Sequence, residues 1–173
     1  MPPFPVVLFL DYDGVLHPVG GVPARQRLAR LPLLEGLLRE PALARVGIVI
    51  SSTWRVVHTA AQLRSQFAPD LRERVLGCTP QLGRFATRHT RHEEIAAWLA
   101  AHPLTRAWVA LDDDVRGFPR EAHDNAVFTD SQAALTADIL PALRARLLRA
   151  LREASSDAGP PPRNDTDTGG TAP

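Results

Sequence analysis

The sequence predicts an α/β fold in which helices cover both faces of a central parallel sheet. Short, wholly apolar runs alternate with segments of helical periodicity, as in successive strand–helix–strand units. The runs lack polar alternation, which is typical of parallel strands buried on both faces. They also end abruptly in acidic or hydroxyl side chains, and such sheets bind their ligands beyond the carboxyl ends of the strands.

The bulk composition fits one domain with its own core. The chain has 173 residues, 45% of them apolar, and a net charge of +1, which gives no strong electrostatic argument for nucleic acid or anionic membrane. All 20 basic residues are arginine, so any cationic group of a site is a guanidinium. Cys78 is the single cysteine, and the first apolar run is too short for a signal peptide or a membrane span. We therefore expect a cytoplasmic protein without membrane contact.

The predicted strands are residues 6–10, 46–50, 107–111 and 126–128, with a brief additional strand near 74–76. Helical spacing covers residues 57–67, 92–101 and 133–151, and Pro141 predicts a kink or a break in the last of these. We assign residues 1–154 to the folded domain. Residues 155–173 lack large apolar side chains, which predicts a disordered tail.

Acidic residues follow two of the predicted strands. Asp11 and Asp13 are two positions apart and are expected to point the same way, and Asp112 and Asp113 end another strand. Such carboxylates repel one another without a cation, and together they offer the oxygen ligands that Mg²⁺ prefers. We therefore predict Asp11, Asp13, Asp112 and Asp113 as metal ligands. A solvated turn is the alternative for the Asp-x-Asp pair.

This pattern suits phosphoryl transfer. One carboxylate can attack phosphorus, and a second can protonate the leaving oxygen and then activate water. Gly14 permits a sharp turn close to a phosphate. Ser51 or Ser52, after the second strand, is expected to hold a phosphate oxygen, with Ser51 preferred; a helix cap is the alternative. Arg55 and His17 are further candidates for substrate contact, and a surface or packing role is the alternative for both.

The motifs at residues 11–15, 48–51 and 109–113 resemble, in order, the first, second and fourth motifs of the haloacid dehalogenase (HAD) superfamily. With residues 16–18, 51–55, 94–99 and 111–114, the chain looks more narrowly like the HAD-like domain of "Swiss Army Knife" RNA repair proteins. The resemblance implies a Rossmann-like three-layer sandwich, Mg²⁺, and hydrolysis of phosphate esters through an aspartyl-phosphate. It implies Asp11 as nucleophile, Asp13 as acid and base, Ser51 as phosphate anchor, and Asp112 as metal ligand.

The third motif of that family is usually a lysine, which this chain lacks. Arg84, Arg88 and Arg91 precede the helix where the lysine would fall; we favour Arg91, then Arg88. Little sequence is left over for a cap, so we expect a capless or minimally capped enzyme that acts on a large phosphorylated substrate such as a polynucleotide end. The sequence does not indicate an oligomeric state.

Two non-enzymatic interpretations compete with this one. A receiver-type signalling domain also carries acids and a Ser or Thr on a parallel sheet, but the position of the Asp-x-Asp pair and the absent lysine argue against it. A catalytically degenerate HAD-like domain that only binds or regulates is the stronger alternative. The presence of Asp11, Asp13 and Asp112 argues against that alternative.

Overall fold

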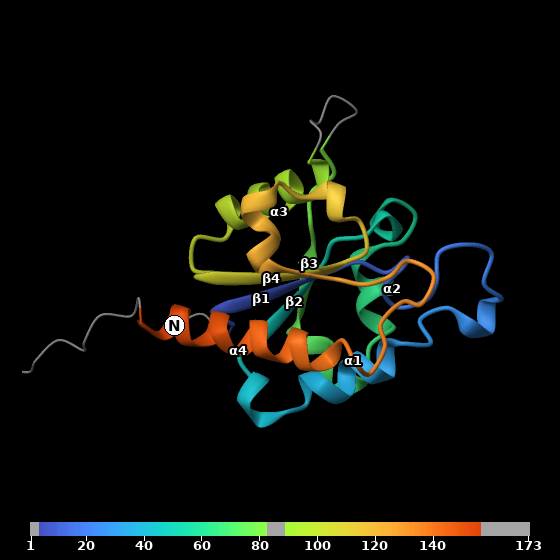
Figure 1. The fold of residues 1–173 in the computed structure, drawn as a ribbon, viewed down its shortest axis with the longest axis horizontal. Helices are drawn as coiled ribbons and strands as arrows, with labels where there is room; N and C mark the ends of the chain where they lie inside the picture. Colours follow the sequence, from blue (N-terminus) through green and yellow to red (C-terminus); the bar gives the residue numbers. More distant parts are fainter. Residues whose placement is uncertain (1–3, 83–88, 157–173) are drawn as a thin grey trace, which may run out of the picture.

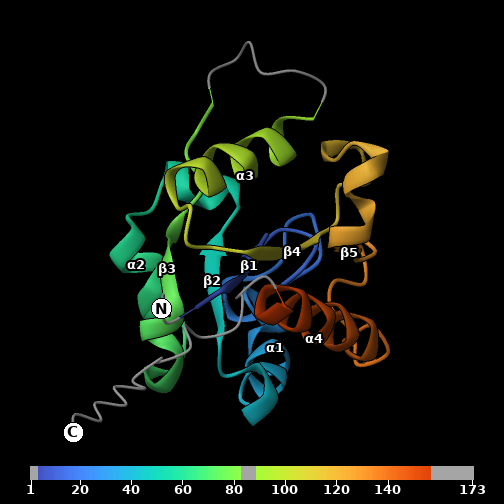
Figure 2. The same cartoon turned by 90° about the vertical axis from the view of Figure 1, so that its left-hand side faces the viewer.

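The computed structural model describes residues 4–82 and 89–156, which form a parallel five-stranded sheet with helices on both faces (Figures 1 and 2). The order across the sheet is β3-β2-β1-β4-β5. The strands are β1 (Val6–Leu10), β2 (Val46–Ile50), β3 (Val75–Cys78), β4 (Ala107–Asp112) and β5 (Ala126–Phe128). The structure confirms the predicted α/β fold, the five strands and their parallel arrangement.

Each face of the sheet has its own helical layer. The helices are α1 (Leu31–Leu38), α2 (Ala60–Ser65), α3 (Thr90–Ala101) and α4 (Leu140–Ser156). Figure 2 shows α3 on one side of the sheet and α1 with α4 on the other. Between β1 and β2 the described chain holds only α1 and two short 3₁₀ turns, Ala24–Gln26 and Pro41–Leu43, which fits the expected minimal cap. None of the described helices is long and apolar enough to cross a membrane.

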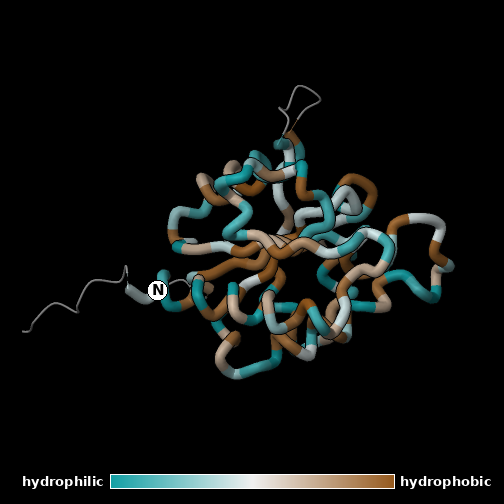
Figure 3. Tube along the Cα trace, viewed as in Figure 1, coloured by the Kyte–Doolittle hydropathy of each residue, from teal (hydrophilic) through white to brown (hydrophobic). Residues whose placement is uncertain are grey.

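Alternate residues of the strands build two separate cores. Along β1, Leu8 and Leu10 pack in the cluster that includes α1 and α4, while Val7 and Phe9 pack with Ile95 and other residues of the α3 side. The alternation follows from the pleat of a strand, which directs successive side chains to opposite faces. Figure 3 shows the strands as a largely hydrophobic centre between more polar outer layers. Burial on both faces explains why the strand sequences are wholly apolar.

The chain reverses its direction across the sheet beside β1. It passes from β1 to β2 and β3 on one side, then returns to β4 and β5 on the other. β1 is paired over its whole length with both β2 and β4, from Val6 to Leu10. The crevice at such a reversal is where open α/β sheets bind ligands. Here the reversal brings the carboxyl ends of β1 and β4 side by side.

The opposite end of the sheet is held by a buried arginine. Arg74 is 9% exposed and donates to three main-chain carbonyls: Nε to Val46 at 2.9 Å, Nη1 to Leu38 at 2.6 Å and Nη2 to Leu43 at 2.8 Å. These carbonyls come from α1, the turn after it and the start of β2. Arg74 therefore joins three segments at the amino ends of the strands.

The two ends of α4, at Leu140 and Ser156, differ from the sequence prediction. Pro141 neither kinks nor interrupts a helix, because α4 begins at Leu140 and places the proline in its first turn, where a missing N–H costs nothing. Residues 133–139, predicted as helix, form turns and the lead into α4. At the other end α4 continues to Ser156, two residues past the predicted domain boundary at 154. The remainder of the predicted tail lies outside the described residues.

Candidate active site

The site begins at the carboxyl end of β1. Asp11 follows the strand directly, is 5% exposed, and continues its pairing with β4 by donating its N–H to the Leu111 carbonyl at 3.0 Å. Its Oδ1 accepts the N–H of Tyr12 at 2.7 Å, and its Oδ2 accepts a hydrogen bond from Arg91 Nη2 at 3.2 Å. The carboxylate is thus fixed in direction by one main-chain and one side-chain donor.

Asp112 and Asp113 meet Asp11 at this edge of the sheet. One oxygen from each of the three carboxylates lies within 4.8 Å of the other two, a spacing that suits a single cation. Asp112 is the last residue of β4 and is 1% exposed; its Oδ1 accepts the N–H of Asp114 at 2.9 Å. The three acids expected to gather at the strand ends therefore do so, and their oxygens are the ligand type that Mg²⁺ prefers.

Gly14 makes room for this cluster. Its φ is +73°, a left-handed conformation that glycine adopts without strain, and a Cβ here would lie 2.2 Å from Asp113 Oδ2. Thr129, which follows β5, donates its hydroxyl to the Gly14 carbonyl at 2.7 Å and so holds the turn in place. The predicted role of Gly14 at a tight turn fits this geometry, with a carboxylate as the group that needs the space.

Arg91 contacts two of these acids from α3. It lies in the first turn of α3, and its Nη2 and Nε reach Asp11 Oδ2 at 3.2 Å and Asp112 Oδ2 at 3.1 Å. Its Nη1 lies 3.8 Å from Glu94 Oε2, one turn along the same helix. Arg91 thus stands where the third-motif cation was expected; Arg84 and Arg88 lie outside the described residues.

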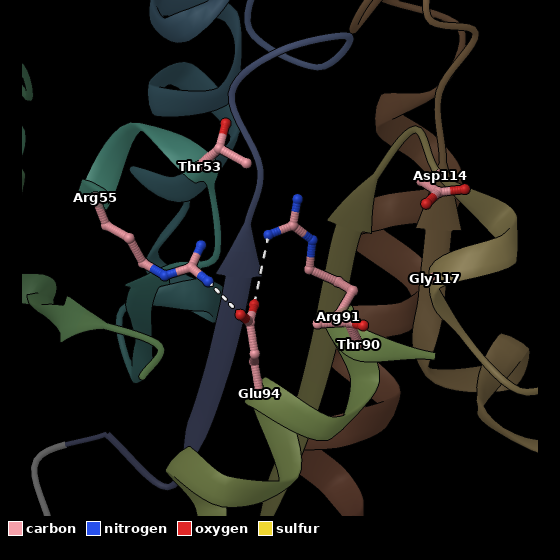
Figure 4. A pocket seen from close by; sticks show the side chains of 7 residues that line it. All are labelled: Thr53, Arg55, Thr90, Arg91, Glu94, Asp114 and Gly117. Atoms are coloured by element: carbon pink, nitrogen blue, oxygen red, sulfur yellow. Dashed lines mark ion pairs between the residues drawn. The ribbon is translucent and has the colours of Figure 1, made fainter. Parts of the chain in front are cut away.

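A second arginine completes the network. Arg55, in the 3₁₀ turn Thr53–Val56, forms a buried ion pair with Glu94 at 2.5 Å and donates to the Ser52 carbonyl at 2.5 Å. Figure 4 shows Glu94 between the guanidinium groups of Arg55 and Arg91, with an ion pair to each. The three side chains line a hollow of about 250 Å³. Arg55 was predicted to contact substrate; in the structure its charge is shared with a protein carboxylate.

Burial sets the ionisation of the acids. Desolvation raises the pKa of Asp11 above its ordinary value, although Arg91 and the Tyr12 N–H act in the opposite direction. Desolvation and the neighbouring Asp11 raise the pKa of Asp112 to about 8, again against the effect of Arg91. Burial also raises the pKa of Asp113. Clustered carboxyl groups with raised pKa values are a feature of functional sites, and a nearby positive charge favours their ionised form.

The Asp13 carboxylate lies apart from the other three predicted metal ligands, and its assignment as a ligand stays a prediction. It does not belong to the three-acid cluster found among the described residues. Instead Oδ1 lies 3.1 Å from His17 Nε2, and Oδ2 accepts the indole N–H of Trp54 at 3.0 Å. The residue lies beyond the end of β1, where the strand has turned, so the strict two-residue alternation no longer applies. Its side chain is 44% exposed and remains available to a substrate.

Two serines follow β2, and the structure distinguishes them. The main-chain N–H of Ser51 donates to the Leu10 carbonyl at 2.8 Å, which places Ser51 beside Asp11, and its buried hydroxyl has no partner among the described residues. The Ser52 side chain acts to lower the pKa of the Asp11 carboxyl, and its hydroxyl caps the following turn by accepting the Trp54 N–H at 3.4 Å. Both serines thus lie near Asp11, and the prediction for Ser51 stays a prediction.

Comparison with known proteins agrees with this geometry. A family model described as the HAD domain in Swiss Army Knife RNA repair proteins matches residues 7–139, well over half of the chain. The chain belongs to this family. Neither a curated protein nor a solved structure matches it. Membership supports a hydrolase of the phosphatase type, and it confirms the resemblance drawn from the motifs.

Sequence reasoning missed the parts that Glu94 and Trp54 play. Glu94 lies three residues after Arg91 in a predicted helix, a spacing that puts both side chains on one face, so their contact could have been anticipated. Its second partner, Arg55, comes from another part of the chain and gave no local signal. Trp54 lies within the motif at residues 51–55, and only the structure shows that its indole N–H reaches Asp13.

Proposed function

We propose that this protein is a Mg²⁺-dependent phosphatase that hydrolyses phosphate monoesters through an aspartyl-phosphate on Asp11. The observation that carries the proposal is the cluster of Asp11, Asp112 and Asp113 around the guanidinium of Arg91, at the point where the strand order reverses. Family membership supports the same chemistry.

The charges of the site fit a divalent cation. Four carboxylates meet two guanidiniums there, which leaves two negative charges without a partner when all six groups are ionised: Asp11, Asp112, Asp113 and Glu94 against Arg55 and Arg91. Asp11, Asp112 and Asp113 would hold the ion, since their oxygens are already gathered. A bound Mg²⁺ would neutralise negative charge on the phosphate oxygens. Arg91 supplies further positive charge beside Asp11.

The carboxyl groups of Asp11 and Asp13 have different roles in the proposed reaction. An oxygen of Asp11 attacks phosphorus, the bond from phosphorus to the leaving oxygen breaks, and protonated Asp13 donates its proton to that oxygen. Asp13 then takes a proton from a water molecule whose oxygen attacks the same phosphorus. The bond between phosphorus and Asp11 breaks, phosphate leaves, and both groups return to their starting states. His17 and Trp54 hold Asp13 in place for both steps.

The shape of the entrance favours a large substrate. The segment between β1 and α1 is short, and it adds only one 3₁₀ turn, Ala24–Gln26, over the sheet edge. A capless site admits the end of a polymer as readily as a small ester. The family description names RNA repair proteins, which supports a polynucleotide end as the substrate, and hydrolysis in the cytoplasm is part of this proposal.

The test is hydrolysis of an aryl phosphate and of phosphorylated RNA and DNA oligonucleotides with and without Mg²⁺. We expect turnover that requires Mg²⁺ and that falls on the order of 10³-fold or more in Asp11→Asn, because the nucleophile is lost. The exposed Asp138→Asn is the matched control and should keep full activity. A phosphorylated protein that releases phosphate with hydroxylamine would identify the acyl phosphate.

Two outcomes would contradict the proposal. If the wild-type protein turns over none of these esters in Mg²⁺, the domain is a binding module and not a phosphatase. If Asp11→Asn retains wild-type activity, the nucleophile lies elsewhere. Phosphorylated peptides and metabolites, tested in parallel, would show whether the polynucleotide end is the preferred substrate.

A further inference from the structure

A second hollow, of about 320 Å³, opens beside Asp13 and shares no lining residue with the hollow between Arg55 and Arg91. This volume lies at the lower end of the range of small-molecule sites. Under the proposed function, Asp13 protonates the leaving oxygen, so the alcohol part of the substrate must lie next to that carboxyl group. Its side chain is 44% exposed and forms part of the wall of this hollow.

Aromatic rings form the wall nearest to Asp13. Trp54, His17 and His58 all line the hollow, and the Trp54 ring centroid lies 5.6 Å from that of His17 and 5.3 Å from that of His58. Trp54 is fixed by its hydrogen bond to Asp13 at 3.0 Å and by an edge contact with buried Tyr12 at 5.4 Å. The ring wall therefore has a set position relative to the catalytic acid.

The rest of the lining is apolar, small or cationic. Val57 is 76% exposed, and Val22, Gly20 and Gly21 line the same hollow. Arg27, which is exposed, adds a positive charge from the segment before α1. An exposed valine alone has no special meaning, but here it borders partly exposed rings beside a reactive carboxyl group.

We infer that this hollow is a leaving-group subsite that stacks a flat aromatic ring of the substrate alcohol against Trp54 and His58. The inference rests on the proposed function and adds the class of ester: nucleotides, and other phosphate esters whose alcohol ends in a flat ring. Aromatic side chains stack such rings regardless of their exact structure, because every ring has a π-face. Arg27 supplies a contact for a second negative charge, such as the next phosphate of a nucleotide.

Benzyl phosphate and cyclohexylmethyl phosphate separate stacking from other effects. The two esters have similar size and similar leaving alcohols, and they differ in whether the ring is flat and aromatic. We expect kcat/KM to be about tenfold higher for the benzyl ester, in the range that base–aromatic stacking provides. His58→Ala should bring the ratio close to one, chiefly through KM for the benzyl ester. Arg64→Gln, an exposed change on α2, should leave the ratio at its wild-type value.

A binding measurement keeps this inference independent of turnover. The phosphonate analogues of both esters are titrated into the Mg²⁺-loaded protein, with tryptophan fluorescence as the readout. Tighter binding of the aromatic phosphonate, lost in His58→Ala, supports the subsite even if no ester is hydrolysed. Equal binding of the two phosphonates, or an unchanged preference in His58→Ala, would overturn it, and the phosphatase proposal would stand or fall on its own assay.

A second pair of ligands tests whether Arg27 binds a second phosphate. Adenosine 3′,5′-bisphosphate carries one more phosphate than adenosine 5′-phosphate, and we expect it to bind about tenfold more tightly through Arg27. Arg27→Gln should remove that advantage, whereas Arg64→Gln should keep it. If Arg27→Gln retains the advantage, the second charge is bound elsewhere and Arg27 has no part in the subsite.

Discussion

The two ends of the sheet each hold an arginine, Arg74 buried and Arg91 partly buried, and the partners of the two arginines differ in kind. Among the described residues, Arg74, at the amino ends of the strands, donates only to main-chain carbonyls. Arg91, at the carboxyl ends, faces carboxylates from β1, β4 and its own helix. Arg74 thus binds neutral acceptors at one end of the sheet, whereas Arg91 binds a cluster of carboxylates at the other.

The electrostatic consequence is opposite at the two ends. Burial lowers the pKa of Arg74, and the nearby Asp70 only partly offsets this. Burial also acts to lower the pKa of Arg91, but Asp11, Asp112 and Glu94 together raise it above its ordinary value. Main-chain carbonyls cannot leave without unfolding, whereas carboxylates can exchange one cation for another. The comparison teaches that an arginine at a sheet end is suited to a structural or to a functional role according to whether its partners can be exchanged.

Replacing Arg91 should give the largest effect. Arg91→Met removes the cation beside Asp11, and kcat/KM should fall about 10²–10³-fold, as when a single charge-stabilising group is lost from an active site. Arg91→Lys should recover part of this loss because it restores the charge without the planar fork. Steady-state kinetics on an aryl phosphate would measure both. Retention of wild-type activity in Arg91→Met would show that another arginine supplies the charge.

Replacing Arg74 should affect stability and not chemistry. Arg74→Met leaves three buried carbonyls without donors, and the free energy of unfolding should fall by about 3–5 kcal/mol. Urea denaturation would measure this, with the exposed Arg64→Met as the control. Mg²⁺ should stabilise Arg74→Met only as much as it stabilises the wild type, so the deficit stays, but it should stabilise Arg91→Met by more, because the ion supplies the lost positive charge. If Mg²⁺ reduced the deficits of the two variants equally, the distinction between the two ends would be wrong.

Glu94→Gln tests the link between Arg91 and Arg55. The amide keeps the shape of the side chain but removes the charge that lies between two guanidiniums. We expect kcat to fall about tenfold, with a smaller change in KM, since Arg91 loses orientation and not its charge. Glu73→Gln, at an exposed position, is the matched control. A change confined to thermal stability would restrict Glu94 to a structural role.

The acidic cluster should make stability depend on pH. Because the pKa of Asp112 is raised from 3.8 to about 8, the folded protein retains a proton that the unfolded chain has released between these values. Raising the pH through this window therefore destabilises the metal-free protein. We expect its melting temperature to fall by a few degrees from about pH 5 to pH 8, and Mg²⁺ to reverse the fall. A melting temperature that rises over this range in EDTA would contradict the raised pKa.

Much of this site could be predicted because its residues are tied to regular elements. Asp11 and Asp112 follow apolar parallel strands, so their meeting at one edge follows from the register of the sheet. Arg91 could be favoured because it directly precedes the predicted helix 92–101, where the third-motif lysine would fall. The position of Pro141 was harder to interpret, since a proline can mark either a break in a helix or its first turn.

The details that escaped prediction depend on contacts between distant segments. Alternation along a strand predicted that Asp13 points the same way as Asp11, but the chain has already turned there, and the Asp13 carboxylate contacts Trp54 and His17. The pairing of Glu94 with Arg55 joins residues on α3 and after β2. The contact of Asp13 with His17 is local, but those of Asp13 with Trp54 and of Glu94 with Arg55 have no signature in local spacing, because they depend on how distant turns meet at the sheet edge.

The full pairing of β1 on both sides has a mechanical consequence. Asp11 is attached to the strand whose main chain has hydrogen-bonded neighbours on either flank, and its own N–H extends that ladder by one residue. Asp13 is attached to the turn that follows, and its carboxylate contacts the side chains of His17 and Trp54. In the proposed mechanism, the attacking atom gains from immobility, whereas the proton carrier must serve first a leaving oxygen and then a water. The change from a paired strand to a turn, two residues along the chain, would give each carboxyl group the freedom of movement that its proposed task requires.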